Sequence, residues 1–300
     1  TNQLAQKQIS KIADAENKKE AELLRKAAVA EAKEALALAD SLKADKVFRQ
    51  QLDNSRNILN SIAGQYLNEK DYDSAVSLID DIAKITGSNT DSEKALKAYV
   101  ISQKIAYLNQ QLAEKQEAKA SQEELDKLKS EISSLQSSTQ TLITELKDKE
   151  LSDQDLQYLA YASEALGDSA QKIELYEQLA QQATFGGVYV SAKDRVETLR
   201  LYDVFNSISS EDKSVLEFQD SLSEMSDNSI KLLLNNYGID TEDMTRTQAL
   251  ERLMDMANRI SFQKKLEDLG EKQNDIAELE KLAKESNNPY VRRAVNNRIE

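Results

Sequence analysis

Pairs of adjacent carboxylates are the residues of this chain that come closest to acid–base or metal chemistry. General acid–base catalysis needs two carboxylates that converge in one cleft with well-separated pKa values. Neighbouring residues on a helix point about 100° apart, so an adjacent pair does not converge by itself. The pairs considered are Asp80–Asp81, Glu123–Glu124, Glu211–Asp212 and Glu242–Asp243.

The chain contains no Cys and no His. This excludes disulfides, zinc sites built from Cys or His, thiol nucleophiles and imidazole bases. A calcium loop beginning at Asp240 would place Glu242 and Glu251 at ligand positions 3 and 12. Met244 then occupies a ligand position and Thr245 replaces the required Gly, so the pattern does not predict a calcium site.

Two short matches to the penicillin-binding signature also occur. They are Ser169-x-x-Lys172 and Ser226-Asp227-Asn228, but no Lys-Thr-Gly follows and the composition does not supply the β-sheet of that site. We therefore predict no catalytic site, no metal and no cofactor, and a protein that is not an enzyme. An enzyme with an all-carboxylate site is the third and least favoured alternative.

The composition predicts an all-α protein. Of the 300 residues, 40% are apolar, only 7 are Gly and only 1 is Pro, which leaves few residues for tight turns. The abundant Ala, Leu, Lys, Glu and Gln favour helix. A chain of this length can bury a core in one elongated domain or in two compact ones.

Net charge and hydropathy narrow the classes of partner. The formal net charge of −14 disfavours nucleic acid and anionic membranes, so we expect another protein or a peptide segment. No apolar run approaches 18 residues, so no transmembrane helix is predicted.

The chain begins at Thr1 and lacks Cys, and we expect an extracytoplasmic module (periplasmic, lipid-anchored or at the cell surface) in preference to a cytoplasmic one.

Residues 1–50 predict a long N-terminal helix, because 3–46 contain no Gly or Pro and are rich in Ala, Lys, Glu and Gln. The apolar stripe is sparse before Leu23, where Ile9 and Ile12 stand almost alone. Such a polar helix needs a partner for stability. Two alternatives stay open for residues 1–20: a frayed terminal helix, or a segment that binds another chain.

Residues 59–83 predict a helix–turn–helix. Helical spacing joins Leu59, Ile62, Ala63 and Tyr66, a turn follows at 69–72, and Ala75, Ile79, Ile82 and Ala83 line the returning helix. This segment resembles a tetratricopeptide repeat, whose paired helices pack through such small and large positions. Lys70 stands where that family usually has a turn Gly, and Ala63 where its first helix usually has one.

A second segment, residues 156–180, is similar to the same repeat. Gly167-Asp168 supplies the turn, whereas Lys172 and Ser163 depart from the family pattern. The resemblance implies an irregular, tetratricopeptide-repeat-like helical solenoid over 51–185. Stacked repeats of this kind form protein-binding surfaces.

Residues 92–150 predict long helices. Leucines and isoleucines hold a heptad register from Leu125 to Leu146, and Ser121 with Glu124 forms a capping pattern that starts a new helix. We expect an antiparallel, coiled-coil-like helical hairpin with its tip near 117–121. A continuous helix of about 55 residues is the alternative.

Residues 186–300 predict a C-terminal helical region packed continuously with the solenoid. Phe185-Gly186-Gly187 indicates a loop, and helices are expected near 211–224, 227–236 and 245–269. Residues 226–258 resemble the helix–extended–helix pattern of SAP and LEM-type modules, families that bind DNA or protein. Six acidic against three basic side chains there argue against phosphate contact, so we expect a helix–loop–helix core element.

We expect the function to be that of a non-enzymatic protein-binding scaffold or adaptor. The resemblance to the repeat family implies that the first helix of each pair carries the contacts. The alternative is a structural or assembly protein that forms homo-oligomers through its long helices, 1–46 and 92–150. The expected partner-binding residues are Asn60, Gln65, Asn68, Gln157, Tyr158 and Tyr161.

Overall fold

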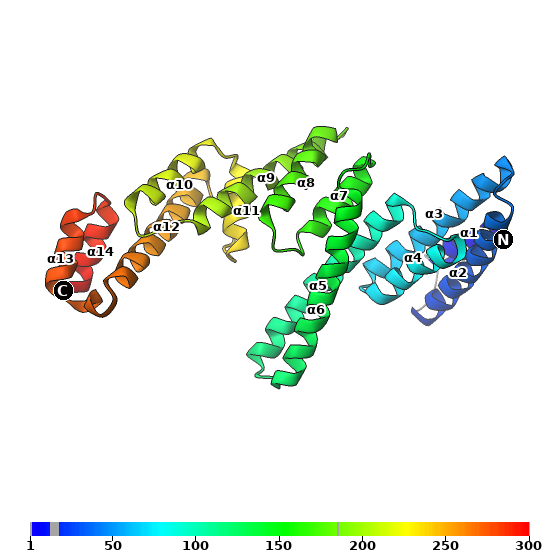
Figure 1. Ribbon diagram of the computed structural model, residues 1–300, viewed down its shortest axis with the longest axis horizontal. Helices are drawn as coiled ribbons and strands as arrows, with labels where there is room; N and C mark the ends of the chain where they lie inside the picture. Colours follow the sequence, from blue (N-terminus) through cyan, green and yellow to red (C-terminus); the bar gives the residue numbers. More distant parts are fainter. Residues whose placement is uncertain (1, 13–17, 185, 300) are drawn as a thin grey trace. The chain divides into compact units, whose positions relative to one another are not determined.

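The computed structural model describes residues 2–12, 18–184 and 186–299, and these residues form an all-α protein with no strand among them (Figure 1). The chain divides into two compact units, which we call unit 1 (Thr1–Asp168) and unit 2 (Ser169–Glu300). None of the described helices is long and apolar enough to cross a membrane.

Unit 1 contains α1 to α7. Their bounds are α1 Asn2–Ile12, α2 Lys18–Ser41, α3 Lys46–Asn68, α4 Tyr72–Thr86, α5 Asp91–Glu117, α6 Gln122–Leu146 and α7 Asp153–Ser163. Successive helices pack as neighbours: α1 on α2, α2 on α3, α3 on α4, and α5 on α6 and α7.

The expectation of a single N-terminal helix is wrong. α1 and α2 are separate helices that pack against each other, and residues 13–17 between them lie outside the described part of the chain. Ala5, Ala28 and Ala32 are fully buried in the core that the two helices share with α3 and α4. Small side chains let helix axes approach closely, so an Ala-rich stripe that is sparse in large apolar residues still forms a packed layer.

The α3–α4 pair packs through positions that were predicted to face inward and contributes them to the core that it shares with α1, α2 and α5. Leu59, Ile62 and Ala63 on α3 and Ile79 and Ile82 on α4 are all fully buried. In the turn between the helices Asp71 caps α4, its side chain accepting a hydrogen bond of 3.1 Å from the Ser74 N–H. Lys70 adopts the left-handed conformation, with φ +62°, at the position where the sequence lacks the expected Gly.

Replacing Lys70 with Gly should raise the free energy of unfolding of unit 1 by up to about 1 kcal/mol. A left-handed residue with a Cβ costs roughly 1–2 kcal/mol, and the extra backbone entropy that Gly loses on folding offsets about 0.5–1 kcal/mol of the gain. Urea unfolding measures the change. The matched control is Lys129→Gly in the middle of α6, which should lower stability by about 1 kcal/mol. A Lys70→Gly protein no more stable than the parent would contradict this account.

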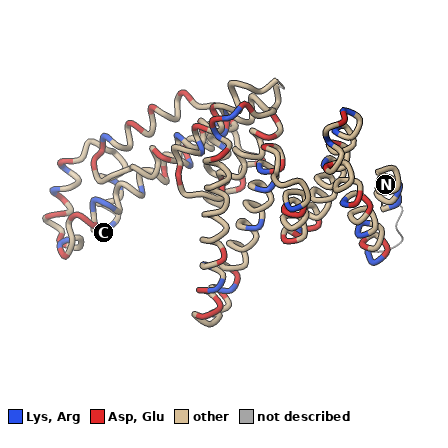
Figure 2. The backbone as a smooth tube through the Cα atoms, turned by 45° about the vertical axis from the view of Figure 1, so that its right-hand side comes forward, with Lys and Arg blue, Asp and Glu red and all other residues tan. Residues whose placement is uncertain are grey.

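The α5–α6 hairpin confirms the expectation of two antiparallel helices over one continuous helix. The turn lies between Glu117 and Gln122, and Ser121 caps α6 by accepting a hydrogen bond from the Glu124 N–H at 3.4 Å. Within unit 1 the free end of the hairpin extends beyond α4 and α7, which pack near its other end (Figure 1). This free end carries charges of both signs (Figure 2), among them the Lys115–Glu124 ion pair at 3.2 Å.

Unit 2 contains α8 to α14. Their bounds are α8 Ser169–Gln182, α9 Gly186–Asn206, α10 Asp212–Glu224, α11 Asp227–Asn236, α12 Arg246–Leu269, the 3₁₀ helix η1 Gly270–Asn274, α13 Ile276–Glu285 and α14 Pro289–Ile299. The helices predicted near 211–224, 227–236 and 245–269 are confirmed as α10, α11 and α12.

The boundary between the units differs from the one expected at 185/186. It falls after Asp168, because α7 packs on α5 and α6 whereas α8 packs on α9. The second repeat-like segment, 156–180, is therefore divided between the two units. The Gly pair expected in a loop instead opens a helix, since α9 begins at Gly186; Phe185 lies outside the described residues.

Residues 226–258 form part of the core of unit 2, as expected of a helix–loop–helix element. Ile230, Leu233 and Leu234 on α11 and Leu253 on α12 are fully buried in one cluster. Phe218 on α10 belongs to the same cluster. The apolar faces of both helices are thus used for packing within unit 2.

Candidate partner-binding surfaces

The three expected contact residues on α7 are brought together, but they bond mainly to each other and to α5. The ring of Tyr158 stacks on Tyr99 of α5 with centroids 5.1 Å apart, and Tyr161 lies 6.1 Å from the same ring. Gln157 donates a hydrogen bond of 2.8 Å from Nε2 to the Tyr161 hydroxyl. Burial raises the pKa of Tyr158 and the nearby Tyr99 adds to the shift, so this hydroxyl stays neutral at physiological pH.

The three expected contact residues on α3 have different environments. Asn68 is exposed, whereas Gln65 is half-buried and accepts a hydrogen bond from Arg25 Nε at 3.4 Å. Asn60 is half-buried, and its Oδ1 atom has no hydrogen-bond partner among the described residues. Of the six residues predicted from the sequence, the α7 set forms one cluster with Tyr99, a residue that the sequence reasoning missed.

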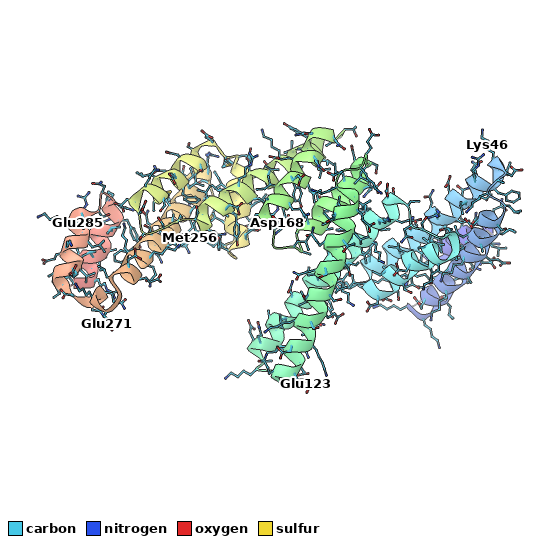
Figure 3. The ribbon with its side chains drawn as sticks, viewed as in Figure 1. Lys46, Glu123, Asp168, Met256, Glu271 and Glu285 are labelled. Carbon is cyan, nitrogen blue, oxygen red and sulfur yellow. The ribbon has the colours of Figure 1, made fainter. Side chains whose placement is uncertain are left out.

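A groove in unit 1 lies between α4 and α6 over α5, and we call it the hairpin groove. Its volume is about 400 Å³. Val76, Ile101, Leu135 and Leu142 give it an apolar floor. The other lining residues, which are polar or charged, are Asp73, Lys97, Lys104, Ser138 and Thr141. Figure 3 shows the side chains along the hairpin, whose free end is marked by Glu123.

The hairpin groove arises because the heptad stripe of α6 is covered on one side only. Ile132 and Leu146, which share one heptad position, are both buried, and Ile132 packs in one cluster with Ile101, Ile105 and Leu108 of α5. Leu135 and Leu142, at the other position, are only half-buried and line the groove. The heptad register is visible in the sequence, but it does not distinguish the covered position from the open one, because that depends on the direction from which α4 approaches.

Ion pairs line the rim of the hairpin groove. Lys104 lies between Asp73 on α4, at 2.8 Å, and Glu131 on α6, at 2.7 Å. Lys97 pairs with Asp80 at 2.5 Å. Burial by itself would lower the pKa of Lys104, but hydrogen bonds and charge from both carboxylates together outweigh it and raise the pKa, so the ammonium stays charged.

A second hollow, which we call the α10–α12 cleft, lies in unit 2 among α10, α12 and the start of α14. Its volume is about 290 Å³. At one edge Lys265 pairs with Asp212 at 3.0 Å, and the Ser286 hydroxyl and the Asn287 N–H each donate to the same carboxylate at 2.8 Å. Burial by itself would raise the pKa of Asp212, but these three donors outweigh it and lower the pKa below its ordinary value.

Asp212→Asn should therefore make unit 2 less stable at neutral pH, by an amount that shrinks in acid. Because the pKa in the folded state lies below that of the unfolded state, ionised Asp212 stabilises unit 2 fully above the ordinary Asp pKa of about 4. That contribution is lost as the pH falls through the lowered value. Urea midpoints from pH 7 to pH 2 measure it. For Asp220→Asn, exposed on the same helix, the difference in urea midpoint from the parent protein should not shrink in acid. A difference for Asp212→Asn that is independent of pH would contradict the stabilising role of the ionised Asp212 carboxylate.

The acidic and hydroxyl residues that the structure describes do not form a metal centre. No group of three or more Asp or Glu side chains in the described residues is arranged to hold a metal ion. The Ser226-Asp227-Asn228 motif has a structural role: Ser226 caps α11, and both Ser226 and Asn228 donate to the Asp194 carboxylate, at 2.8 and 3.1 Å. These bonds join α11 to α9.

Candidates for binding among the described residues include the hairpin groove, the α10–α12 cleft and the two sets of residues predicted on α3 and α7. Comparison with protein-family models, with curated proteins and with solved structures yields no match to this chain.

Proposed function

We propose that this chain is a non-enzymatic protein-binding scaffold that holds an amphipathic helix of a partner in the hairpin groove. The observation that carries the proposal is the half-covered apolar stripe of α6 facing α4. Leu135 and Leu142 lie seven residues apart on one face of α6, about 10 Å along its axis. An amphipathic helix presents apolar residues at this spacing and can fill an open apolar groove.

The charged rim fits a helix better than an extended strand. An incoming helix satisfies its own backbone hydrogen bonds, whereas a strand needs an exposed sheet edge to pair with. The groove is lined only by helices, and its rim offers ion pairs and hydroxyls at Lys97, Lys104, Ser138 and Thr141. The polar face of a bound helix can contact this rim and remain partly in water.

A tetratricopeptide-repeat-like character is proposed only for α3–α4. Supporting it are the buried small residues Ala63 and Ala75, the buried Tyr66 and the capped turn at Asp71. In this view Asn60, Gln65 and Asn68 on α3, and Gln157, Tyr158 and Tyr161 on α7, form a second contact surface. The two surfaces make different predictions about where a partner is bound.

Photo-crosslinking in the cells that make this protein tests the proposal. A photoreactive residue at Ser138 should give an adduct with a discrete protein, and the adduct should map to an amphipathic helix. The matched control is Ser133, also exposed on α6 but about 140° around the helix from Ser138. Leu142→Gln should abolish the Ser138 adduct, whereas Ser137→Gln on the exposed face should not.

The second part of the photo-crosslinking experiment places photoreactive residues at Asn68 and Gln157. Adducts confined to these two positions would overturn the hairpin groove as the site while supporting a scaffold that uses α3 and α7. Equal adducts at Ser133 and Ser138, or none at any position, would overturn the proposed function as a whole.

The alternative function, self-assembly through the long helices, is favoured by one observation. Leu23 and Leu38 on α2 are 62% and 55% exposed, and Val47 at the start of α3 is 64% exposed. Exposed large apolar residues are typical of interfaces when they gather in one patch. Sedimentation velocity over a wide concentration range tests this: assembly that Leu38→Glu reverses supports it, and a monomer at all concentrations excludes it.

A further inference from the structure

The α10–α12 cleft has an apolar wall that is left open to solvent. Val215 and Leu216 of α10, Met254 of α12, and Pro289 and Tyr290 of α14 form this wall. Leu216 is 58% exposed although it lines the cleft. The cleft belongs wholly to unit 2, between the end of α13, marked by Glu285 in Figure 3, and the part of α12 marked by Met256.

One positive charge in the cleft is not neutralised. The carboxylate of Asp212 is fully engaged by Lys265, Ser286 and the Asn287 N–H, as described above. Arg293 lines the cleft and makes no ion pair or hydrogen bond with the other side chains that the structure describes. Arg293 is exposed, and its guanidinium offers two parallel donors to a carboxylate.

Amide groups provide further donors and acceptors. Asn288 is held in place, since its Nδ2 donates to Asn258 Oδ1 at 2.7 Å and its Oδ1 accepts from the Tyr290 N–H at 2.9 Å. The Asn258 Nδ2 group and the side chain of Gln219 remain without partners among the described residues. They can bind a carboxylate oxygen that Arg293 leaves unsatisfied.

We propose that the α10–α12 cleft binds a small monocarboxylate with a compact apolar body. Its carboxylate pairs with Arg293 and its apolar part lies against Leu216, Met254 and Tyr290. At about 30 Å³ for each water-sized group, a volume of 290 Å³ holds about ten heavy atoms. This is close to the lower end of the roughly 300–1,000 Å³ that ligand pockets occupy. The site does not depend on the hairpin groove.

Methyl NMR of the full chain labelled at its Met residues tests this directly. The chain has 4 Met, of which only Met254 lines the cleft, so Met225, Met244 and Met256 serve as internal controls. The probes are octanoate and N-acetylleucine, which carry the same carboxylate on an aliphatic and on a peptide-like body. Their neutral counterparts are octanamide and N-acetylleucinamide.

At least one acid should shift the Met254 methyl signal and bind about tenfold more tightly than its amide, a difference of about 1.4 kcal/mol. Arg293→Gln should reduce the affinity for the acid to that for the amide. Arg292→Gln, at the neighbouring arginine that is also exposed but does not line the cleft, should not. Which acid binds more tightly identifies the body that the cleft accepts.

The proposal is overturned if neither acid shifts Met254, if acid and amide bind equally, or if the preference for the acid survives Arg293→Gln. All of these results are independent of the photo-crosslinking at Ser138, so failure of this site and failure of the proposed scaffold function are distinguishable.

Discussion

Replacing Arg56 with Met is expected to lower the free energy of unfolding of unit 1 by about 3–5 kcal/mol. Arg56 on α3 donates from Nη1 to Glu93 Oε2 at 2.6 Å and from Nη2 to the Thr86 hydroxyl at 2.7 Å. Glu93 is 1% exposed, and its Oε1 atom has no partner among the described residues. Loss of the guanidinium leaves a buried carboxylate without a positive partner, whose Oε2 still accepts from the Thr90 N–H and from Asn89 Nδ2 at 3.2 Å.

The size of this effect follows from the buried Glu93 carboxylate that remains after the substitution. Breaking a buried ion pair from one side is costly because the other charge stays away from water without a partner. The pair also joins three elements, since Arg56 belongs to α3, Thr86 to the end of α4 and Glu93 to the start of α5. Hydrogen exchange measured by mass spectrometry should therefore show lost protection in all three helices.

Two further variants test whether the unpaired buried carboxylate causes the loss of stability. Arg49→Met, on the same helix and exposed, should change stability by no more than about 0.5 kcal/mol. Adding Glu93→Gln to Arg56→Met should recover most of the loss, because a neutral amide is far less costly to bury and still accepts from the Thr90 N–H. If Arg56→Met costs no more than Arg49→Met, the buried pair does not stabilise unit 1.

Phe218→Ala should lower the free energy of unfolding of unit 2 by about 3–5 kcal/mol. Phe218 is fully buried and meets the ring of Phe205 edge-on, with centroids 5.1 Å apart and planes 61° apart. The substitution removes this aromatic contact and leaves a cavity in the cluster shared by α9, α10, α11 and α12.

Hydrogen exchange distinguishes a local effect from a global one. We expect Phe218→Ala to reduce the protection of α9 to α12 and to leave α3 to α5 unchanged, the reverse of the pattern for Arg56→Met. Leu216→Ala, on the same helix but 58% exposed, is the matched control and should cost far less. Equal loss of protection in both units after Phe218→Ala would show that the two units unfold together.

The parts of the fold that the sequence predicted depend on capping patterns and apolar spacing within short segments. The capping pair Ser121 and Glu124 and the heptad register that follows it favoured the hairpin over a continuous helix, because capping and i,i+3/i,i+4 packing act within one helix or between neighbours in the chain. The core positions of α3 and α4 were predicted for the same reason, since their spacing alone places them on one face.

The candidate sites depended on contacts that spacing does not specify. Tyr158 was expected to meet a partner, but its ring stacks on Tyr99, 59 residues earlier in the chain. Nothing in the spacing of the sequence places Arg293 beside Leu216 and Met254, because their proximity results from the packing of α14 on α12. Residues far apart in sequence meet only when the helices that carry them have docked.

By itself, the sequence determined the all-α class, the core positions of α3 and α4 and the approximate bounds of α10, α11 and α12, and it favoured the hairpin over one continuous helix. These follow from the period of the apolar residues and from the scarcity of Gly and Pro, which are properties of short segments. The tertiary structure alone decided that residues 2–12 and 18–41 form two helices packed on each other, that the chain divides after Asp168, and that the α6 stripe is covered on one side. Each of these depends on which neighbouring helix a given helix face packs against. Helices with similar apolar stripes can pack against different neighbours, so the packing of the whole unit determines the neighbour.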